Sequence, residues 1–178
     1  HGHAIKTDGT LWGWGYNYQN QIGDGTTTIR SSPVQIGSAT TWASISSGSK
    51  TGHAIKTDGT LWGWGLNSNN QIGDGTATQR ASPVQVGSAT NWASTSQGPK
   101  GGHGIKTDGT LWGWGLNTAK QIGDGTTTNR PSPVQIGSDT TWASIANGGN
   151  SGHAIKTDGT LWGWGYEAIG DGTTTSRA

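Results

Sequence analysis

The sequence contains no cysteine, no methionine and no phenylalanine, and Glu167 is its only glutamate. Without cysteine the chain can form no disulfide, no thiolate zinc site and no cysteine nucleophile. A single glutamate leaves it without the paired carboxylates that acid–base catalysis commonly uses. No apolar run approaches 18 residues, so the sequence predicts no membrane-spanning helix.

The sequence also lacks an excess of positive or negative charge. The 178 residues include 11 Lys+Arg and 10 Asp+Glu, for a formal net charge of +1. This balance provides no basic field that would attract DNA or RNA, so we expect no nucleic-acid partner. A G-x-S-x-G nucleophile elbow and a G-x-x-x-x-G-K-[ST] phosphate loop are both missing. We therefore expect a non-enzymatic protein of one domain with no cofactor.

Glycine and tryptophan are in excess, with 33 and 11 residues. A disordered chain is poor in aromatic residues, and collagen requires glycine at every third position. Neither class fits this composition.

The whole chain, residues 1–178, is one array of repeats with a period of 50 residues. Residues 1–50, 51–100 and 101–150 are complete copies, and residues 151–178 are a truncated fourth copy. The string IKTDGTLWGWG occurs in every copy, at residues 5–15, 55–65, 105–115 and 155–165. Self-similarity at such a period indicates a repeat architecture.

Within one copy, every local signal indicates β-structure. The expected strands are residues 3–7, 10–15, 33–36 and 42–45, with an Asp8-Gly9 hairpin turn between the first two. Residues 17–30 are expected as a loop, and Pro33 as the first residue of its strand. Four short strands per 50-residue unit predict an all-β fold, a β-propeller of about three and a half four-stranded antiparallel blades. The expected strands number three, four, four and three along the chain.

Every tryptophan falls at one of three positions of the repeat, which indicates a structural core. The first set is Trp12, Trp62, Trp112 and Trp162, the second is Trp14, Trp64, Trp114 and Trp164, and the third is Trp42, Trp92 and Trp142. Alternation along residues 10–15 places Trp12 and Trp14 on one face of the strand and Gly13 on the other. We expect the tryptophan pair of one blade to fill the space above Gly13 of the next.

The pattern AIKTDGTLWGWGxN…QIGDGTTTxRxSPVQIG…WASI resembles the repeat of the regulator of chromosome condensation family, and is most similar to its bacterial members. The resemblance covers essentially all 178 residues. It implies a seven-bladed propeller, of which this chain would be a part or an assembling half. Family members act in guanine-nucleotide exchange, chromatin binding, ubiquitin ligases and β-lactamase inhibition. The resemblance therefore implies protein binding through loops on a propeller face.

The sequence departs from the family at one loop position, where Asn20, Asn70 and Lys120 replace the usual glycine. If the backbone there requires a positive φ, asparagine is tolerated and lysine is costly. The fourth copy lacks three residues in the same loop, where it reads Tyr-Glu-Ala-Ile at residues 166–169.

Recurring histidine and aspartate residues are the candidates for a metal site. Equivalent histidines on neighbouring blades are expected too far apart to share one ion. Each aspartate stands alone among threonines, short of the several oxygen donors that calcium requires. We therefore expect structural histidines, turn-stabilising aspartates paired with the arginine six residues later, and no metal. The residues are His3, His53, His103 and His153, Asp24, Asp74, Asp124 and Asp171, and Arg30, Arg80, Arg130 and Arg177.

Where nearly identical copies differ in sequence, packing does not determine which residue occupies the position. They lie mostly in the expected loops, where binding usually resides on a rigid scaffold, although neutral drift would leave the same variation. The candidate binding residues are Tyr16, Tyr18, Gln19, Leu66, Asn69, Leu116, Lys120 and Tyr166.

Three functions remain open at this point. The first is a protein-interaction module, which fits both the resemblance and the missing catalytic motifs. The second is a structural protein that self-associates into a surface fibre or sheath, because head-to-tail contacts produce rings or filaments. The third is a multivalent, lectin-like glycan-binding propeller, which requires exposed tryptophan or tyrosine rings. The low charge and the many threonine, serine, asparagine and glycine residues suggest an extracellular or cell-surface location.

Overall fold

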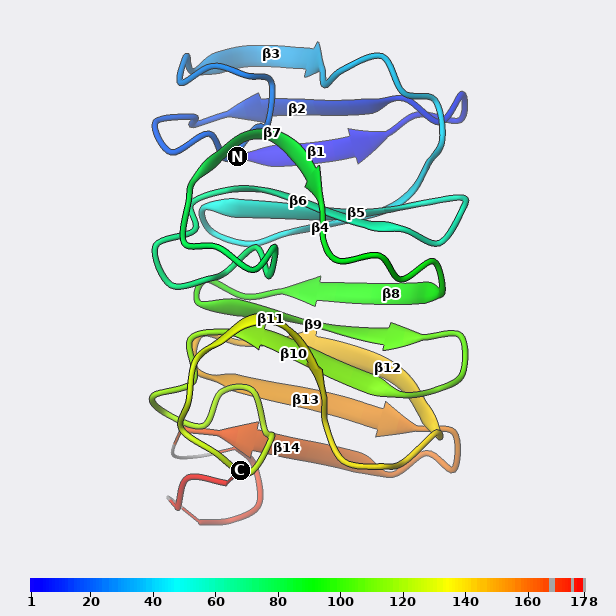
Figure 1. Cartoon of the computed structure of the whole chain (residues 1–178), viewed down its shortest axis with the longest axis vertical. Helices are drawn as coiled ribbons and strands as arrows, with labels where there is room; N and C mark the ends of the chain where they lie inside the picture. Colours follow the sequence, from blue (N-terminus) through cyan, green and yellow to red (C-terminus); the bar gives the residue numbers. More distant parts are fainter. Residues whose placement is uncertain (167–168, 174, 178) are drawn as a thin grey trace.

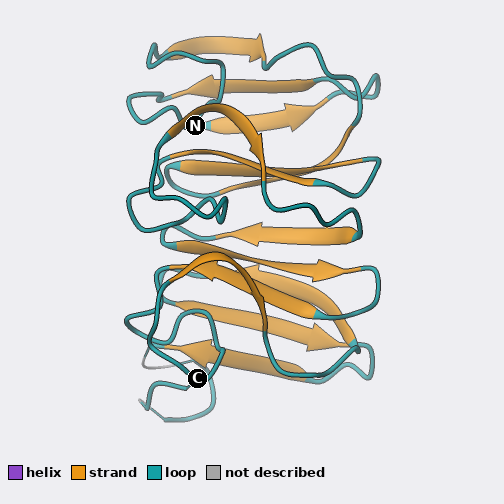
Figure 2. Cartoon of the chain, in the orientation of Figure 1, coloured by secondary structure: helices purple, strands orange, loops and turns teal. Residues whose placement is uncertain are grey.

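The computed structural model describes residues 1–166, 169–173 and 175–177, and over these residues it contains fourteen strands and no helix (Figure 2). The strands are β1 (Gly2–Ile5), β2 (Leu11–Gly15), β3 (Arg30–Gln35), β4 (Trp42–Ser47), β5 (Thr51–Lys56), β6 (Leu61–Gly65), β7 (Arg80–Gln85), β8 (Trp92–Gln97), β9 (Gly101–Lys106), β10 (Leu111–Gly115), β11 (Arg130–Gln135), β12 (Trp142–Asn147), β13 (Ser151–Lys156) and β14 (Leu161–Gly165). No helix in the described residues is long and apolar enough to cross a membrane.

The strands form four antiparallel sheets, which we call blades 1 to 4. Their strand orders are β1-β2-β3, β4-β5-β6-β7, β8-β9-β10-β11 and β12-β13-β14. The predicted all-β class and the predicted series of three, four, four and three strands are confirmed. Figure 1 shows the blades following one another along the long axis, with blade 1 at one end and blade 4 at the other, so these sheets do not close into a ring. The seven-bladed ring and the assembling half-propeller stay predictions.

Each complete blade combines strands from two sequence repeats. β4 lies at the end of residues 1–50 but pairs with β5, which opens residues 51–100, and β8 pairs with β9 in the same way. The blade is therefore offset from the sequence repeat, and consecutive repeats are joined through hydrogen-bonded strands as well as through the chain.

The hairpin turn in each blade forms as the Asp-Gly pair predicts. Asp8 Oδ1 accepts hydrogen bonds from Thr10 N at 3.0 Å and from Thr10 Oγ1 at 2.6 Å. Gly9 has a φ of +77°, which glycine adopts without steric cost. The turn therefore fixes the register in which Ile5 faces Leu11.

The predicted start of the third strand is wrong by three residues. β3 begins at Arg30, which faces Gly15 across a register shift, rather than at Pro33. Pro33 lies inside this strand and is tolerated because β3 is at the edge of its sheet, where a missing N–H breaks no ladder.

The core is divided among the three contacts between consecutive blades. In each, aliphatic side chains of one blade meet tryptophans of the next. Between blades 2 and 3, for example, Leu61 and Ile72 pack with Trp92 and Trp114. One face of each blade is thus aliphatic and the other carries tryptophan.

The three tryptophan sets differ in burial. The third set is buried, with exposures of 5% for Trp42, 4% for Trp92 and 9% for Trp142. In the second set Trp64, Trp114 and Trp164 are buried while Trp14 is half-buried, and in the first set Trp12, Trp62 and Trp112 are half-buried.

Trp162 differs from the expectation that every tryptophan is a core residue, because its exposure is 50%. Its equivalent Trp62 faces Gln85 of the neighbouring strand β7. β14, in contrast, is the last strand of its sheet in the described residues, so no complete strand covers this side of Trp162.

The expected stacking of tryptophan over Gly13 is wrong. The atoms nearest to Gly13 belong to Ile22, His3 and Ile36 of its own blade. The loop after β2 folds back and covers this glycine, so the next blade cannot reach it. Trp64 of blade 2 instead packs against Gly23 in that loop.

Candidate functional site: the loop face

All eight candidate binding residues lie at one end of the strands, which we call the loop face. It comprises the long loops at residues 16–29, 66–79 and 116–129, the short turns at residues 48–50 and 98–100, and Tyr166 after β14. In Figure 2 these segments lie on the left of the molecule. The long loops and short turns are joined by main-chain hydrogen bonds, such as Leu66 N to Lys50 O at 3.0 Å.

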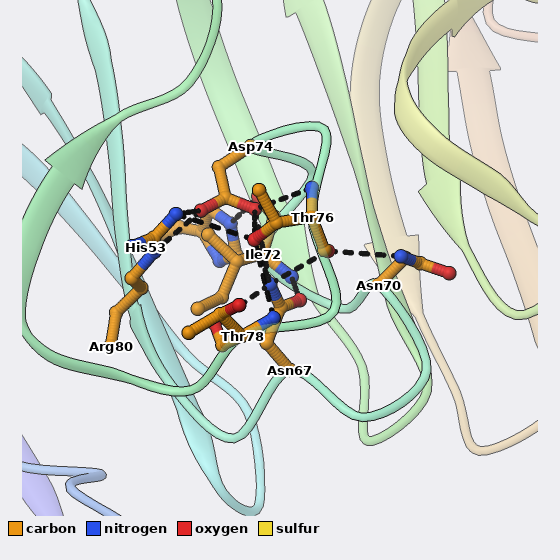
Figure 3. A network of polar contacts seen from close by, with 8 residues as sticks. All are labelled: His53, Asn67, Asn70, Ile72, Asp74, Thr76, Thr78 and Arg80. Carbon is orange, nitrogen blue, oxygen red and sulfur yellow. Dashed lines mark hydrogen bonds and ion pairs between the residues drawn. The ribbon is translucent and has the colours of Figure 1, made fainter.

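A fully buried asparagine organises each long loop. In blade 2, Asn67 Nδ2 donates to Asp74 Oδ1 at 3.0 Å and to the main-chain oxygens of Thr76 and Thr78 at 2.9 and 3.1 Å (Figure 3). Its Oδ1 accepts from Ile72 N at 2.9 Å. One side chain thus replaces the main-chain partners that a strand would supply, and so holds an irregular loop in one shape.

Aspartate and arginine close the same loop. Asp74 Oδ1 accepts from Thr76 N and Oγ1, and an Asp74–Arg80 ion pair of 2.6 Å forms through Oδ2. Burial alone would raise the pKa of the Asp74 carboxyl, but hydrogen bonds from Thr76 and Arg80 outweigh burial and hold that pKa below its usual value. The predicted turn aspartates with local ion pairs are confirmed, with the equivalent pairs Asp24–Arg30, Asp124–Arg130 and Asp171–Arg177.

The recurring histidine forms a hydrogen bond to the long loop of its own blade. His53 is buried, and its Nε2 donates to Ile72 O at 2.8 Å. Its ring lies 5.4 Å from the ring of Trp114 in the next blade. Burial lowers the pKa of His53 to about 4, against the smaller opposing effect of the Ile72 hydrogen bond. The neutral histidine therefore packs between two blades, and no group of three or more metal-ligating side chains occurs in the part of the chain that is described.

The loops of consecutive blades are connected into one surface. Gly25 N donates to Ala81 O at 2.9 Å, and Gly75 N donates to Pro131 O at 2.8 Å. The Gln79 side chain also donates to Asn20 Oδ1 in the loop of the preceding blade. The loop face is therefore continuous across blades 1 to 3.

The candidate residues are placed unevenly on this face. Tyr16 and Tyr18 are 62% and 64% exposed, and their rings meet edge to face with centroids 5.5 Å apart. Tyr166 is 48% exposed on blade 4. The other five candidates are half-buried and are spread over the long loops of blades 1, 2 and 3: Gln19, Leu66, Asn69, Leu116 and Lys120. Among these candidates, a ring contact joins Tyr16 and Tyr18 of blade 1.

The loop position that departs from the family has a positive φ in all three copies. The values are +57° for Asn20, +60° for Asn70 and +62° for Lys120. The conditional prediction of a left-handed backbone is confirmed, and Lys120 carries the steric cost that glycine would avoid.

Ile29 belongs to the exposed surface but is missing from the candidate residues. It is 43% exposed. In blade 3 the equivalent Asn129 accepts a hydrogen bond from Asn117 N at 2.8 Å, so this position lies beside the start of the loop. In blade 1 Ile29 is the last residue of the long loop that begins with Tyr16. The copies read isoleucine, glutamine and asparagine at this position, which places it among the variable positions that packing does not dictate.

The opposite end of the strands, the turn face, carries a second repeated arrangement. In blade 2, Lys56 Nζ lies 3.9 Å from the ring centroid of Trp62 and 4.9 Å from that of Trp42. Blades 3 and 4 repeat it with Lys106 and Lys156. Clefts of about 500, 490 and 530 Å³ lie at this face where blade 1 meets blade 2, blade 2 meets blade 3 and blade 3 meets blade 4. The Asp-Gly pairs predict only a structural role for these turns, although a lysine two residues before each turn aspartate marks them.

A family model, the regulator of chromosome condensation (RCC1) repeat, matches residues 8–55, 58–98 and 108–155, and a second model of the same repeat matches residues 42–71. No curated protein sequence is a significant match to this chain.

Solved structures share the fold. Human WBSCR16 has a TM-score of 0.85 at 17% identity, over 99% of this chain and 47% of its own. Prp20p from Saccharomyces cerevisiae has a TM-score of 0.86 at 21% identity, over 97% and 46%. Yeast RCC1 (Prp20) bound to Kap60 has a TM-score of 0.82 at 21% identity, over 94% and 42%. The chain thus spans less than half the length of these relatives, and the likeness concerns the β-propeller fold.

Proposed function

Since three copies of the family repeat match most of its length, the chain belongs to the regulator of chromosome condensation (RCC1) repeat family, and we propose that it is a non-enzymatic protein-binding module. Relatives of this fold bind proteins: yeast RCC1 was solved with Kap60, and Prp20p is described with binding properties to Gsp1p and histones. For this chain we assign binding to the loop face.

The observation that carries the proposal is the exposed aromatic patch on blade 1, in which the rings of Tyr16 and Tyr18 meet; the exposed Ile29 belongs to the same long loop. Exposed apolar groups that cluster mark interaction surfaces. Tyrosine is enriched among the residues that contribute most to binding, because it buries a large ring and keeps a polar hydroxyl. The patch stands on a loop fixed by the buried Asn17, so little ordering entropy opposes binding.

Charge on the same face indicates the chemistry of the partner. The side chains of Asp24, Asp74 and Asp124 are only 4–5% exposed and are each paired with an arginine. The lysines of the loop face form none of the ion pairs found among the described residues: Lys50, Lys100 and Lys120. We therefore propose a partner protein with an apolar anchor and an acidic rim, because complementary charge accelerates encounter. An extracellular or cell-surface location remains our proposal, from composition alone.

The experiment compares three immobilised proteins: the wild-type chain, the double variant Tyr16→Ser/Tyr18→Ser, and a turn-face control, Thr57→Ser. Each is exposed to the same protein mixtures and to a glycan array. We expect at least one protein that binds wild type and control equally, and binds the double variant at least tenfold more weakly by calorimetry. Loss of a tenfold factor corresponds to about 1.4 kcal/mol.

Two results would contradict the proposal. Equal binding of the partner to all three proteins would remove the tyrosine patch from the site. Glycan binding that the double variant loses, with no protein bound by the wild type, would favour the lectin-like function instead.

A further inference from the structure

A small polar cavity lies where blade 3 meets blade 4. Its volume is about 20 Å³, and His103, Gln121 and Asn147 are among the residues that line it. Each of these side chains has one buried polar atom without a hydrogen-bond partner among the described residues: His103 Nδ1, Gln121 Nε2 and Asn147 Oδ1. His103 and Gln121 are only 4% and 7% exposed. Unpaired polar atoms are costly in a protein interior, so three of them around one cavity indicate a ligand.

The hydrogen bonds of the two amides determine which of their atoms is unpaired. Asn147 Nδ2 donates to Ser96 O at 2.5 Å, so the atom that remains is the amide oxygen, an acceptor. Gln121 Oε1 accepts from Ala119 N at 2.8 Å, so the atom that remains is the amide nitrogen, a donor. A carbonyl oxygen can only accept and a main-chain N–H can only donate, so neither amide can be turned the other way.

The histidine supplies a second acceptor. His103 Nε2 lies 3.0 Å from Ile122 O, which can only accept, so this nitrogen carries the proton. Trp164 Nε1 is 3.3 Å from the same nitrogen, but it has a closer acceptor in Gln121 O at 3.0 Å. Burial lowers the pKa of His103, so the ring is neutral at pH 7. The unprotonated Nδ1 is therefore an acceptor.

We propose that this cavity binds one water molecule, which bridges blades 3 and 4. A water needs a cavity of about 10–15 Å³, so the volume suffices for one. The water donates to His103 Nδ1 and to Asn147 Oδ1 and accepts from Gln121 Nε2, which satisfies all three atoms. The same set disfavours other occupants. A cation would meet the hydrogens of the Gln121 amide, an anion would meet two acceptors, and a partner's hydroxyl has one hydrogen for two acceptors.

The equivalent positions in blades 2 and 3 make direct contacts. Ser47, the equivalent of Asn147, has its Oγ 2.8 Å from His3 Nδ1. Gln97 is longer than asparagine by one methylene group, and its Nε2 reaches Gln71 O at 3.3 Å. Asparagine is too short for the second contact, so we expect water where glutamine has its amide.

The water connects a loop of the loop face to the next blade. Gln121 belongs to the long loop at residues 116–129, and Asn147 is the last residue of β12. The inference does not depend on the proposed protein-binding function, which uses Tyr16 and Tyr18 of blade 1. Either proposal can fail while the other holds.

The test is cross-relaxation between water and the side-chain amide protons of Gln121, measured by NMR in the laboratory and rotating frames. A long-bound water gives signals of opposite sign in the two frames, whereas surface hydration and proton exchange give equal signs. We expect opposite signs in the wild type and in the control Asn91→Thr, which places at the turn face the threonine that the other complete copies carry. We expect the signal to vanish in Asn147→Gln, whose longer amide takes the place of the water.

A crystal structure of the wild type is the second measurement, and it does not depend on the folding of any variant. We expect an oxygen within about 3.2 Å of His103 Nδ1, Gln121 Nε2 and Asn147 Oδ1. Ser151 also lines the cavity, and a signal relayed by its hydroxyl would persist in Asn147→Gln. A signal that persists in this variant overturns the proposal, and so do equal signs in the wild type or electron density without this oxygen.

Discussion

The indole nitrogen of Trp64 donates a 3.0 Å hydrogen bond to the main-chain oxygen of Gln21, which lies 43 residues earlier in the preceding blade. The bond recurs between Trp114 and Gln71. It attaches a strand of one blade to the loop of another, so the contact that joins blades also helps to fix the loop face. Packing between blades and the shape of the candidate site are therefore coupled.

Replacing Trp64 with phenylalanine should show this coupling. The change leaves a buried carbonyl without its donor and removes part of a buried ring, so we expect the free energy of unfolding to fall by about 2 kcal/mol or more. Urea denaturation followed by the remaining tryptophan fluorescence measures it. Trp162→Phe is the matched control: because Trp162 is 50% exposed, we expect a loss below about 1 kcal/mol. If both variants lost the same free energy of unfolding, the contact between Trp64 and Gln21 would not be what stabilises the joined blades.

Local features of this fold could be predicted from the sequence, and contacts between blades could not. The Asp8-Gly9 turn and the number of strands depend on neighbouring residues, so they are evident in the repeat. The covering of Gly13 depends on the path of a loop, and no local pattern specifies that path. Leu61 and Leu161 have identical neighbours in sequence, yet Leu61 is buried against tryptophans of blade 3, whereas Leu161 is 69% exposed among the described residues.

The candidate site was predicted in part for the same reason. Variation between copies identified Tyr16 and Tyr18, because packing does not constrain exposed positions. The same variation marks Ile29, whose exposure follows from the path of the loop. The asymmetry of the face is, in contrast, evident in the sequence, because only the first copy carries two tyrosines in this loop, Tyr16 and Tyr18.

Lys120→Gly should stabilise the protein. Lys120 has a φ of +62°, a left-handed conformation that costs a residue with a Cβ roughly 1–2 kcal/mol. Glycine removes this strain but loses more conformational entropy on folding, so we expect a net gain of about 1 kcal/mol. The midpoint of urea denaturation measures it. Asn70→Gly, at the same position of blade 2, should gain less because asparagine tolerates this conformation. A lower midpoint for Lys120→Gly would contradict the strain argument.

Stability should fall as the pH falls from about 7 to about 4. Burial lowers the pKa of His3 and of His53 to about 4, whereas an unfolded histidine titrates near 6.5. Between these values the unfolded chain binds protons that the folded chain does not, so the free energy of unfolding decreases with decreasing pH. Each histidine should contribute a loss of about 2 kcal/mol by pH 5. Melting temperature against pH measures the effect.

A variant that cannot titrate tests the assignment of this pH dependence. In His53→Gln the amide can still donate to Ile72 O, while the titrating group is gone. We expect the slope of stability between pH 6.5 and pH 4 to fall by about a third, since His3 remains and so does His103, whose pKa burial also lowers. The loop aspartates, whose pKa values lie below the usual range, contribute only near the low end of this pH range, where the carboxyls of the unfolded chain begin to bind protons. An unchanged slope would mean that other groups cause the acid sensitivity.

Asn67→Asp should destabilise blade 2 despite its nearly identical shape. Asn67 Nδ2 donates to the Asp74 carboxylate and to two main-chain oxygens, so an aspartate would place a buried acceptor against three acceptors and a like charge beside Asp74. We expect a loss of about 3 kcal/mol or more at pH 7. Urea denaturation measures this loss, and hydrogen exchange at the amides of residues 68–76 should rise as the loop opens. Asn69→Asp, two residues away and outside this network of side chains, should change stability by less than about 0.5 kcal/mol. If both variants were as stable as the wild type, the buried asparagine would not be what holds the loop.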